Sequence, residues 1–127
     1  MHVLSLRTAQ RFYSNATAQM IPGAALHSVN RLVAREPVVV FIKGTPEHPR
    51  CKHSKQLVEL LERASLTQYA YVDTLEASES REAVKCVSAW DLLPQVFADG
   101  EFVGGLEAIE ELQEHQRLRS VLRRALA

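Results

Sequence analysis

The residues with the clearest chemical potential form a C-x-x-S pattern, CKHS at residues 51–54, after a predicted strand and a loop. Cys51 stands where the loop becomes a helix, and a helix start presents unpaired N–H groups and about half a positive charge, which stabilise a thiolate. Lys52, Lys55 and Lys43 are expected to add positive charge nearby. Because the thiolate attacks disulfides and binds metals, Cys51 is predicted to be a catalytic nucleophile and a metal ligand. An inert cysteine at a helix start is the alternative.

The fourth residue of the pattern limits the chemistry. After a strand, C-x-x-C at a helix start marks thioredoxin-like redox sites, and here Ser54 replaces the second sulfur by a hydroxyl. One thiol still forms a mixed disulfide with a small thiol, or supplies one ligand to a metal centre. Cys86 is interpreted as a buried structural thiol, with a resolving role toward Cys51 as the alternative. Zinc binding by His48, Cys51 and His53 is not favoured, because they supply only three ligands and their spacing matches no common zinc framework.

Composition and charge exclude some partners. The chain has 127 residues, enough for one domain with its own core. Residues 1–35 hold four Arg and no acidic residue, a net charge of +4, whereas residues 36–127 hold 11 basic and 15 acidic residues, a net charge of −4. An acidic main domain is a poor non-specific ligand for nucleic acid, and no apolar run approaches the ~20 residues of a membrane-spanning helix. We therefore expect neither nucleic acid nor a membrane as a partner.

The first 20 residues, MHVLSLRTAQRFYSNATAQM, contain Arg, Ser, Thr and Leu and no acid. This composition is typical of a mitochondrial targeting segment, and Arg7 and Arg11 interrupt the apolar core that a secretory signal needs. A disordered polar tail is the alternative. The chain is thus divided into a targeting segment, residues 1–20, and a domain, residues 21–127. The predicted location is the mitochondrial matrix, a reducing compartment that suits a working thiol.

Hydrophobic periodicity and turn signals predict an α/β fold. An early strand–helix–strand unit implies parallel neighbours, and Asp99-Gly100 is a strong hairpin signal between two later strands. The simplest arrangement of these elements is a four-stranded mixed sheet flanked by helices on both faces. The predicted elements are helix 24–34, strand 38–42, helix 51–64, strand 68–72, helix 80–87, strands 95–98 and 101–103, helix 106–114, and a last helix that carries Leu118, Val121, Leu122 and Ala125.

From residue 26 to residue 126 the chain resembles the monothiol glutaredoxins, most closely their mitochondrial single-domain branch. The most specific part is the long loop FIKGTPEHPRC at residues 41–51, which separates monothiol from dithiol glutaredoxins. Trp90, PQV at residues 94–96 and GEFVGG at residues 100–105 match as well. The resemblance implies a thioredoxin fold with a glutathione-binding groove.

The same resemblance implies a homodimer that holds a 2Fe–2S cluster between two protein cysteines and two glutathione thiols. Members pass such clusters to iron–sulfur acceptor proteins. Cys51 is then the cluster ligand, and the cofactors are the 2Fe–2S cluster and glutathione. A 2Fe–2S cluster commonly takes four thiolates, which a monomer with one active thiol cannot supply.

Five further positions match glutathione-binding residues of the family. Lys43 matches the lysine that binds the glycine carboxylate of glutathione, and Arg81 matches a basic position suited to pair with the same carboxylate. The backbone of Leu93, which precedes a proline that is cis in the family, matches the partner of the cysteinyl part. Leu106, by its main chain, and Glu107 match the positions that receive the γ-glutamyl end. As the alternative, Lys43 and Arg81 are merely solvated.

The chain departs from the family motif CGFS, because Lys52 and His53 replace Gly and Phe. Lys52 brings bulk and charge to the cluster position, with two opposite consequences: obstruction of the cluster, or a further lowered pKa of Cys51. His53 is interpreted as a second ligand, a proton carrier or simply a surface residue. Leu92 stands where the family often has a polar residue, which leaves a low-molecular-weight thiol related to glutathione open as the ligand.

Three functions are ranked on these grounds. The first is glutathione-dependent 2Fe–2S cluster binding and transfer in mitochondrial iron–sulfur protein assembly, with weak or no oxidoreductase activity. The second is a glutathione-dependent thiol–disulfide oxidoreductase with Cys51 as nucleophile. The third is a binding module of the same fold without thiol chemistry.

Overall fold

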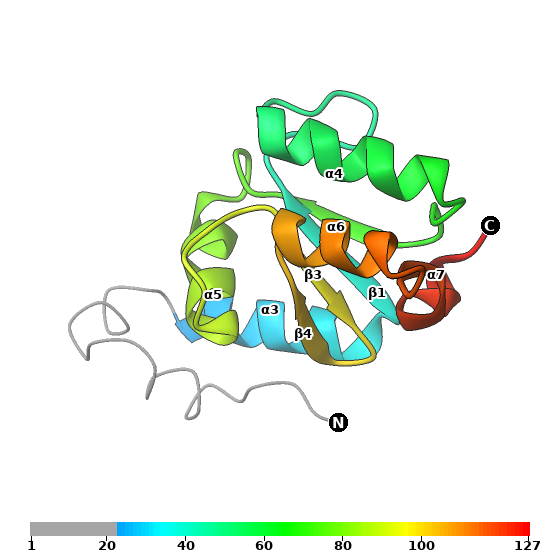
Figure 1. Ribbon diagram of the computed structural model, residues 1–127. Coiled ribbons are helices and arrows are strands. Elements are labelled where there is room, and N and C mark those ends of the chain that lie inside the picture. Colours follow the sequence, from blue (N-terminus) through cyan, green and yellow to red (C-terminus); the bar gives the residue numbers. More distant parts are fainter. Residues whose placement is uncertain (1–22) are drawn as a thin grey trace.

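Four strands form the centre of the structure, a computed structural model that describes residues 23–127 (Figure 1). The strand order is β2-β1-β3-β4, with β1 parallel to β2 and antiparallel to β3, and β3 antiparallel to β4. This confirms the predicted four-stranded mixed sheet. The predicted targeting segment, residues 1–20, lies outside the described residues. The elements are α3 (Gly23–Arg35), β1 (Val38–Ile42), α4 (Lys52–Arg63), β2 (Ala70–Asp73), α5 (Ser78–Ser88), β3 (Gln95–Ala98), β4 (Glu101–Gly104), α6 (Leu106–Glu114), α7 (Leu118–Val121) and a 3-10 turn (Arg123–Ala125).

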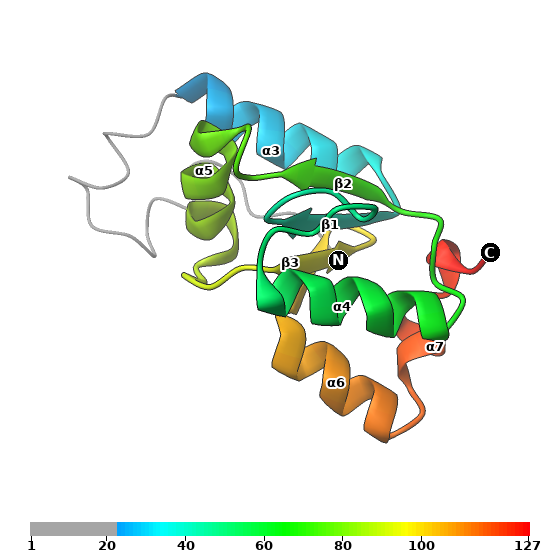
Figure 2. The same ribbon diagram turned by 90° about the horizontal axis from the view of Figure 1, so that it is seen from above.

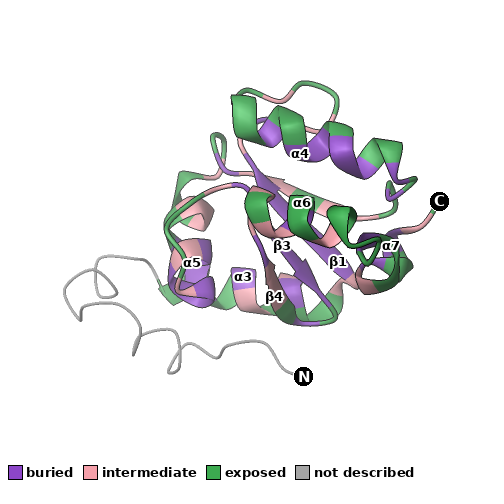
Figure 3. Cartoon of the chain, viewed as in Figure 1, coloured by how far each residue is buried: buried purple, intermediate pink, exposed green. Residues whose placement is uncertain are grey.

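Helices cover both faces of the sheet, α3 and α5 on one face and α4 and α6 on the other (Figure 2). All five residues of β1 are buried, so this strand is enclosed on both sides (Figure 3). Because side chains alternate along a strand, Val38, Val40 and Ile42 join the core cluster of α4 and α6, whereas Val39 and Phe41 join that of α3 and α5. The two cores fix β1, and with it the residue that follows its carboxyl end.

Two elements differ from the sequence-based expectation. The second strand spans Ala70–Asp73 rather than residues 68–72, because the N–H of Gln68 donates to the carbonyl of Ala125 at 2.9 Å instead of joining the sheet. The expected last helix is split into α7 and the 3-10 turn at Arg123–Ala125. Long-range pairing decides both boundaries, and local patterns do not report it. The other predicted elements agree with the structure to within two residues at each end.

Within residues 23–127, none of the helices combines the length and the apolar character that crossing a bilayer requires.

Hydrogen bonds order the loop between β1 and α4. The N–H of Arg50 donates to the carbonyl of Lys43 at 2.8 Å, and the N–H of Gly44 donates to Asp73 Oδ1 at 2.9 Å, which ties the loop to the end of β2. Gly44 has a φ of +95°, and a Cβ added there lies 2.5 Å from the carbonyl oxygen of His48. Only glycine fits this position without a backbone shift.

We expect Gly44→Ala to lower the free energy of unfolding by more than about 1 kcal/mol, because both the positive φ and the contact with backbone atoms oppose a side chain. Urea denaturation followed by circular dichroism measures this change. Gly23→Ala is the matched control, since nothing lies within 4 Å of a Cβ there. A Gly44 variant as stable as the Gly23 variant contradicts the assignment of this constraint.

Candidate functional site

Cys51 is the N-cap residue of α4. Its backbone is extended, with φ −146° and ψ 141°, and its carbonyl accepts a hydrogen bond from the N–H of Lys55 at 2.9 Å. The thiol is half-buried and directly precedes the first turn, whose N–H groups have no partner within the helix. The predicted position of this cysteine at a helix start is confirmed.

The pKa of the Cys51 thiol lies below its ordinary value. Burial raises this pKa, but the backbone N–H groups of Ser54 and His53, the positive charge of Lys43 and the hydroxyl of Ser54 together lower it by more. The sulfur of Cys51 accepts no capping hydrogen bond from the first turn of α4. We therefore attribute the effect of the two N–H groups to their dipoles. The site therefore favours the thiolate.

Ser54 has a role that the sequence analysis missed. Its side chain is fully buried, and its Oγ accepts a hydrogen bond from the N–H of Lys43 at 3.0 Å. Because Oγ accepts from the N–H of Lys43, the hydroxyl hydrogen of Ser54 is available to the sulfur of Cys51. This agrees with the contribution of the Ser54 hydroxyl to the lowered pKa of Cys51. The i, i+3 spacing of the two side chains was a signal for this contact, because such residues share a helix face.

Of the three lysines expected to act on Cys51, Lys43 is the one that lowers its pKa. Lys52 and Lys55 are exposed and are not among the groups that shift it. The prediction that Lys52 and Lys55 add to the effect is therefore wrong. Their side chains lie on the solvent side of α4, whereas Lys43 follows the buried strand β1 and is half-buried.

Arg81 lies in the first turn of α5, and its backbone N–H donates to the carbonyl of Ala77 at 3.1 Å. This turn begins shortly after β2, whose end is tied to the loop of Gly44 by Asp73. Among the described residues, the Nε atom of Arg81 is buried and has no hydrogen-bond partner. A buried donor without a partner is costly, so Arg81 is suited to receive an acceptor from a ligand.

A cavity of about 600 Å³ lies between the start of α4, the segment before β3 and the start of α6. It brings together three of the predicted site residues, Leu93, Leu106 and Glu107, with His53 on the side of Cys51. Lys43, Arg81 and Cys51 itself are not part of its lining. The remaining lining residues are Gln56, Trp90, Leu92, Pro94, Phe102, Gly104, Gly105, Ala108, Glu110 and Glu111.

The floor of this cavity depends on two backbone features. The peptide bond between Leu93 and Pro94 is cis, as the resemblance implied. Gly104 has a φ of +144°, and a Cβ added there lies 2.5 Å from the Cβ of Ala108. A side chain at residue 104 therefore collides with the first turn of α6, so the close packing of β4 on α6 requires the glycine.

Cys86 is fully buried in the core cluster of α3 and α5, and burial raises the pKa of its thiol. This agrees with the structural interpretation and not with a resolving role, which needs an accessible thiolate. In the part of the chain that the structure describes, no three His, Cys, Asp or Glu side chains gather as a metal site. The zinc interpretation of His48, Cys51 and His53 thus finds no support.

The family model described as Glutaredoxin matches residues 38–103, a range that runs from β1 into β4 and contains Cys51. The chain belongs to the glutaredoxin family. A zebrafish (Danio rerio) relative named "Glutaredoxin-related protein 5, mitochondrial" is 38% identical over 97 residues, which is 76% of this chain and 61% of that protein. "Monothiol glutaredoxin-5, mitochondrial" of Lachancea kluyveri is 33% identical over 123 residues, which is 95% of this chain and 80% of that protein.

Longer glutaredoxins also match. Human "Glutaredoxin-3" is 36% identical over 97 residues, but the match spans only 29% of that protein. The chain thus covers less than a third of such a relative. Its similarity to proteins named as monothiol and mitochondrial glutaredoxins agrees with the family that the loop before Cys51 indicated.

Solved structures confirm the thioredoxin-like glutaredoxin fold. The mature form of Trypanosoma brucei 1CGrx1 is 39% identical with a TM-score of 0.67, and the match covers 77% of this chain and 68% of that one. The holo form of glutaredoxin C1 from Populus tremula x tremuloides is 27% identical with a TM-score of 0.69, over 80% of this chain and 89% of that one.

We expect Lys43→Met to raise the pKa of Cys51, because the substitution removes the positive charge that stabilises the thiolate. Lys52→Met makes the same chemical change on an exposed neighbour and is expected to leave the pKa unchanged. The pH dependence of Cys51 alkylation by iodoacetamide, in a Cys86→Ala background, measures both. Equal pKa values in the two variants contradict the assignment to Lys43.

Proposed function

We propose that this glutaredoxin carries a 2Fe–2S cluster as cargo, bound by Cys51 of two copies and two glutathione thiols, and transfers it to iron–sulfur acceptor proteins. The observation that carries the proposal is the thiol inventory. The chain has two cysteines, of which Cys86 is fully buried and Cys51 is half-buried with a lowered pKa. One copy therefore offers one accessible thiolate, and a four-thiolate cluster needs a second copy and small thiols.

The charges around Cys51 suit glutathione, which carries two carboxylates and one ammonium. Lys43 and Arg81 are the cations proposed for the glycine carboxylate, and the unpartnered Nε of Arg81 supports this role. Glu107, exposed at the start of α6, is proposed for the ammonium of the γ-glutamyl end, next to the main chain of Leu106. The backbone of Leu93 is proposed to pair with the cysteinyl part. A related low-molecular-weight thiol with the same charged ends fits these residues equally.

The proposed location is the mitochondrial matrix. The relatives named as mitochondrial support it, and so does the acid-free, Arg-bearing composition of residues 1–20. We accordingly propose residues 1–20 as the targeting segment and residues 21–127 as the glutaredoxin domain.

Anaerobic reconstitution with iron, sulfide and glutathione tests this function. We expect the wild type to become coloured, with a visible charge-transfer spectrum and the mass of a dimer, since two copies are needed to complete the ligand set. Cys51→Ser is expected to stay colourless and monomeric, because it removes the protein ligand.

Cys86→Ala is the matched control, because it removes the other thiol without touching the site, and it is expected to behave as the wild type does. A wild type that remains a colourless monomer, or a Cys51→Ser variant that retains the cluster, overturns the proposal.

The lowered pKa of a half-buried thiol favours a second function, thiol–disulfide exchange. In this reaction the Cys51 thiolate attacks the glutathione sulfur of a glutathionylated protein, and the protein sulfur leaves as a thiolate. A second glutathione thiolate then attacks the Cys51 mixed disulfide and releases glutathione disulfide, which regenerates the Cys51 thiolate. Cys86 is not needed in this cycle.

Turnover of a glutathionylated peptide in the presence of glutathione measures this activity. It is expected to be lost in Cys51→Ser, and in the wild type to decline as the pH falls through the lowered pKa of Cys51, where the thiolate is protonated. A rate no higher than that of the serine variant argues against the second function.

A further inference from the structure

Gln95 is a polar residue in a place where side chains are apolar. It is the first residue of β3, pairs with Phe41 of the central strand β1, and is fully buried. Gln95 directly follows the cis bond between Leu93 and Pro94. Neither the sequence analysis nor the proposed set of glutathione-binding residues gives it a role.

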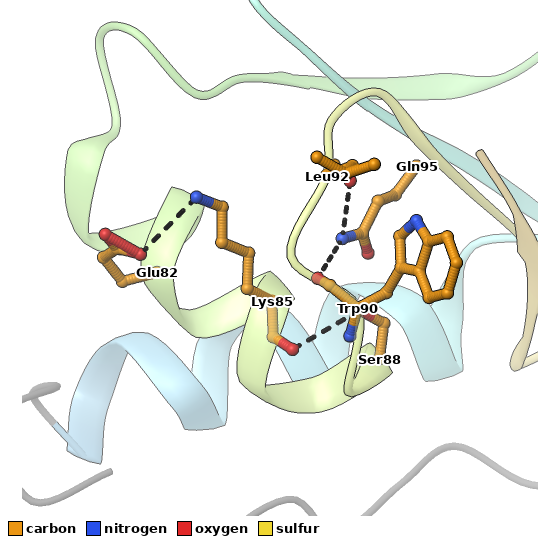
Figure 4. A network of polar contacts seen from close by, with 6 residues as sticks. All are labelled: Glu82, Lys85, Ser88, Trp90, Leu92 and Gln95. Carbon is orange, nitrogen blue, oxygen red and sulfur yellow. Dashed lines mark hydrogen bonds and ion pairs between the residues drawn. The ribbon is translucent and has the colours of Figure 1, made fainter. Parts of the chain in front are cut away.

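The side-chain amide of Gln95 is bonded to the loop before β3. Its Nε2 donates to the carbonyl oxygen of Trp90 at 2.8 Å and to that of Leu92 at 3.1 Å (Figure 4). Both partners are carbonyl oxygens, which only accept, so the NH₂ group must face them and its two hydrogens are both used. The amide therefore holds two carbonyls, one of them directly before Leu93.

The loop between α5 and β3, whose carbonyls bind Gln95, exposes large side chains to solvent. Trp90 is 47% exposed and Leu92 is 66% exposed. At its start the loop is fixed to α5, where the N–H of Trp90 donates to Ser88 Oγ at 3.1 Å and to the carbonyl of Lys85 at 3.1 Å (Figure 4). Beyond that point Gln95 connects it to the buried sheet.

The oxygen of the same amide, in contrast to its nitrogen, makes no hydrogen bond to the described residues. Among residues 23–127, its Oε1 is one of the few buried side-chain atoms without a hydrogen-bond partner. An unpaired buried oxygen opposes folding, whereas the NH₂ group supplies donors to two loop carbonyls. The benefit of the amide lies in its NH₂ group and in the loop that this group orients.

We infer that Gln95 is a positioning residue, which orients the backbone of Leu93 for pairing with the peptide part of a glutathione attached to Cys51. This inference rests on the proposed use of glutathione. It predicts an effect on glutathione but not on a small thiol that lacks a peptide backbone. It also predicts that the pKa of Cys51, set by α4 and β1, stays unchanged.

Thiol–disulfide exchange at equilibrium tests the inference. The Cys51 thiolate attacks one sulfur of glutathione disulfide, a mixed disulfide forms, and the second glutathione leaves as a thiolate; mass spectrometry in redox buffers measures the equilibrium constant. Gln95→Met keeps the side-chain length but has no N–H donor. We expect it to lower this constant about tenfold, from the loss of two hydrogen bonds that set the pairing geometry. The constant for 2-hydroxyethyl disulfide is expected to be unchanged.

Leu118→Ala is the matched control for a general loss of stability, because Leu118 is fully buried in α7, at the end of the domain opposite the start of α4 (Figure 1). Both constants are expected to stay at wild-type values in this variant. One outcome refutes the role of Gln95 alone: the wild type prefers glutathione over the small thiol, but Gln95→Met lowers the constants for the two disulfides equally or changes neither. The proposed function then stands. If the wild type shows no such preference, the glutathione groove and the role of Gln95 are both refuted.

Discussion

The chemistry of this glutaredoxin depends on the stabilisation of one thiolate at the start of α4. Burial of the sulfur opposes the charge, so the site has to supply compensating dipoles and charge from nearby. The N–H groups of the first turn come with the helix itself, but the charge of Lys43 comes from the end of β1. The position of β1 relative to α4 therefore adds to the acidity of Cys51, after the larger effect of the N–H groups of the helix.

The packing of β1 on both faces provides this fixed position. Its five residues are buried between two helical layers, and the N–H of Lys43 then donates to the buried hydroxyl of Ser54 in α4. The same strand pairs with β3, which carries Gln95 and follows Pro94. The thiol and the segment of Leu93 are thus held by neighbouring strands of one sheet, which fixes their position relative to each other.

Much of the fold and part of the site could be predicted from the sequence. The apolar run of β1, the Asp99-Gly100 hairpin and the position of Cys51 at a helix start all follow from local patterns, and the structure agrees with them. The segment at residues 68–72 and the last helix were predicted less well, because the pairing of Gln68 with Ala125 joins parts of the chain that are far apart in sequence. A propensity read along the chain contains no information on such partners.

By itself the sequence determined the types of the elements and the single C-x-x-S thiol, since these follow from residue chemistry and short-range patterns. Only the tertiary structure decided which lysine acts on Cys51, that Ser54 accepts from Lys43, and that the amide of Gln95 faces two loop carbonyls. The physical reason is that charge interactions and hydrogen bonds depend on distance and direction in space, and neighbours in space are set by the packing of the whole sheet.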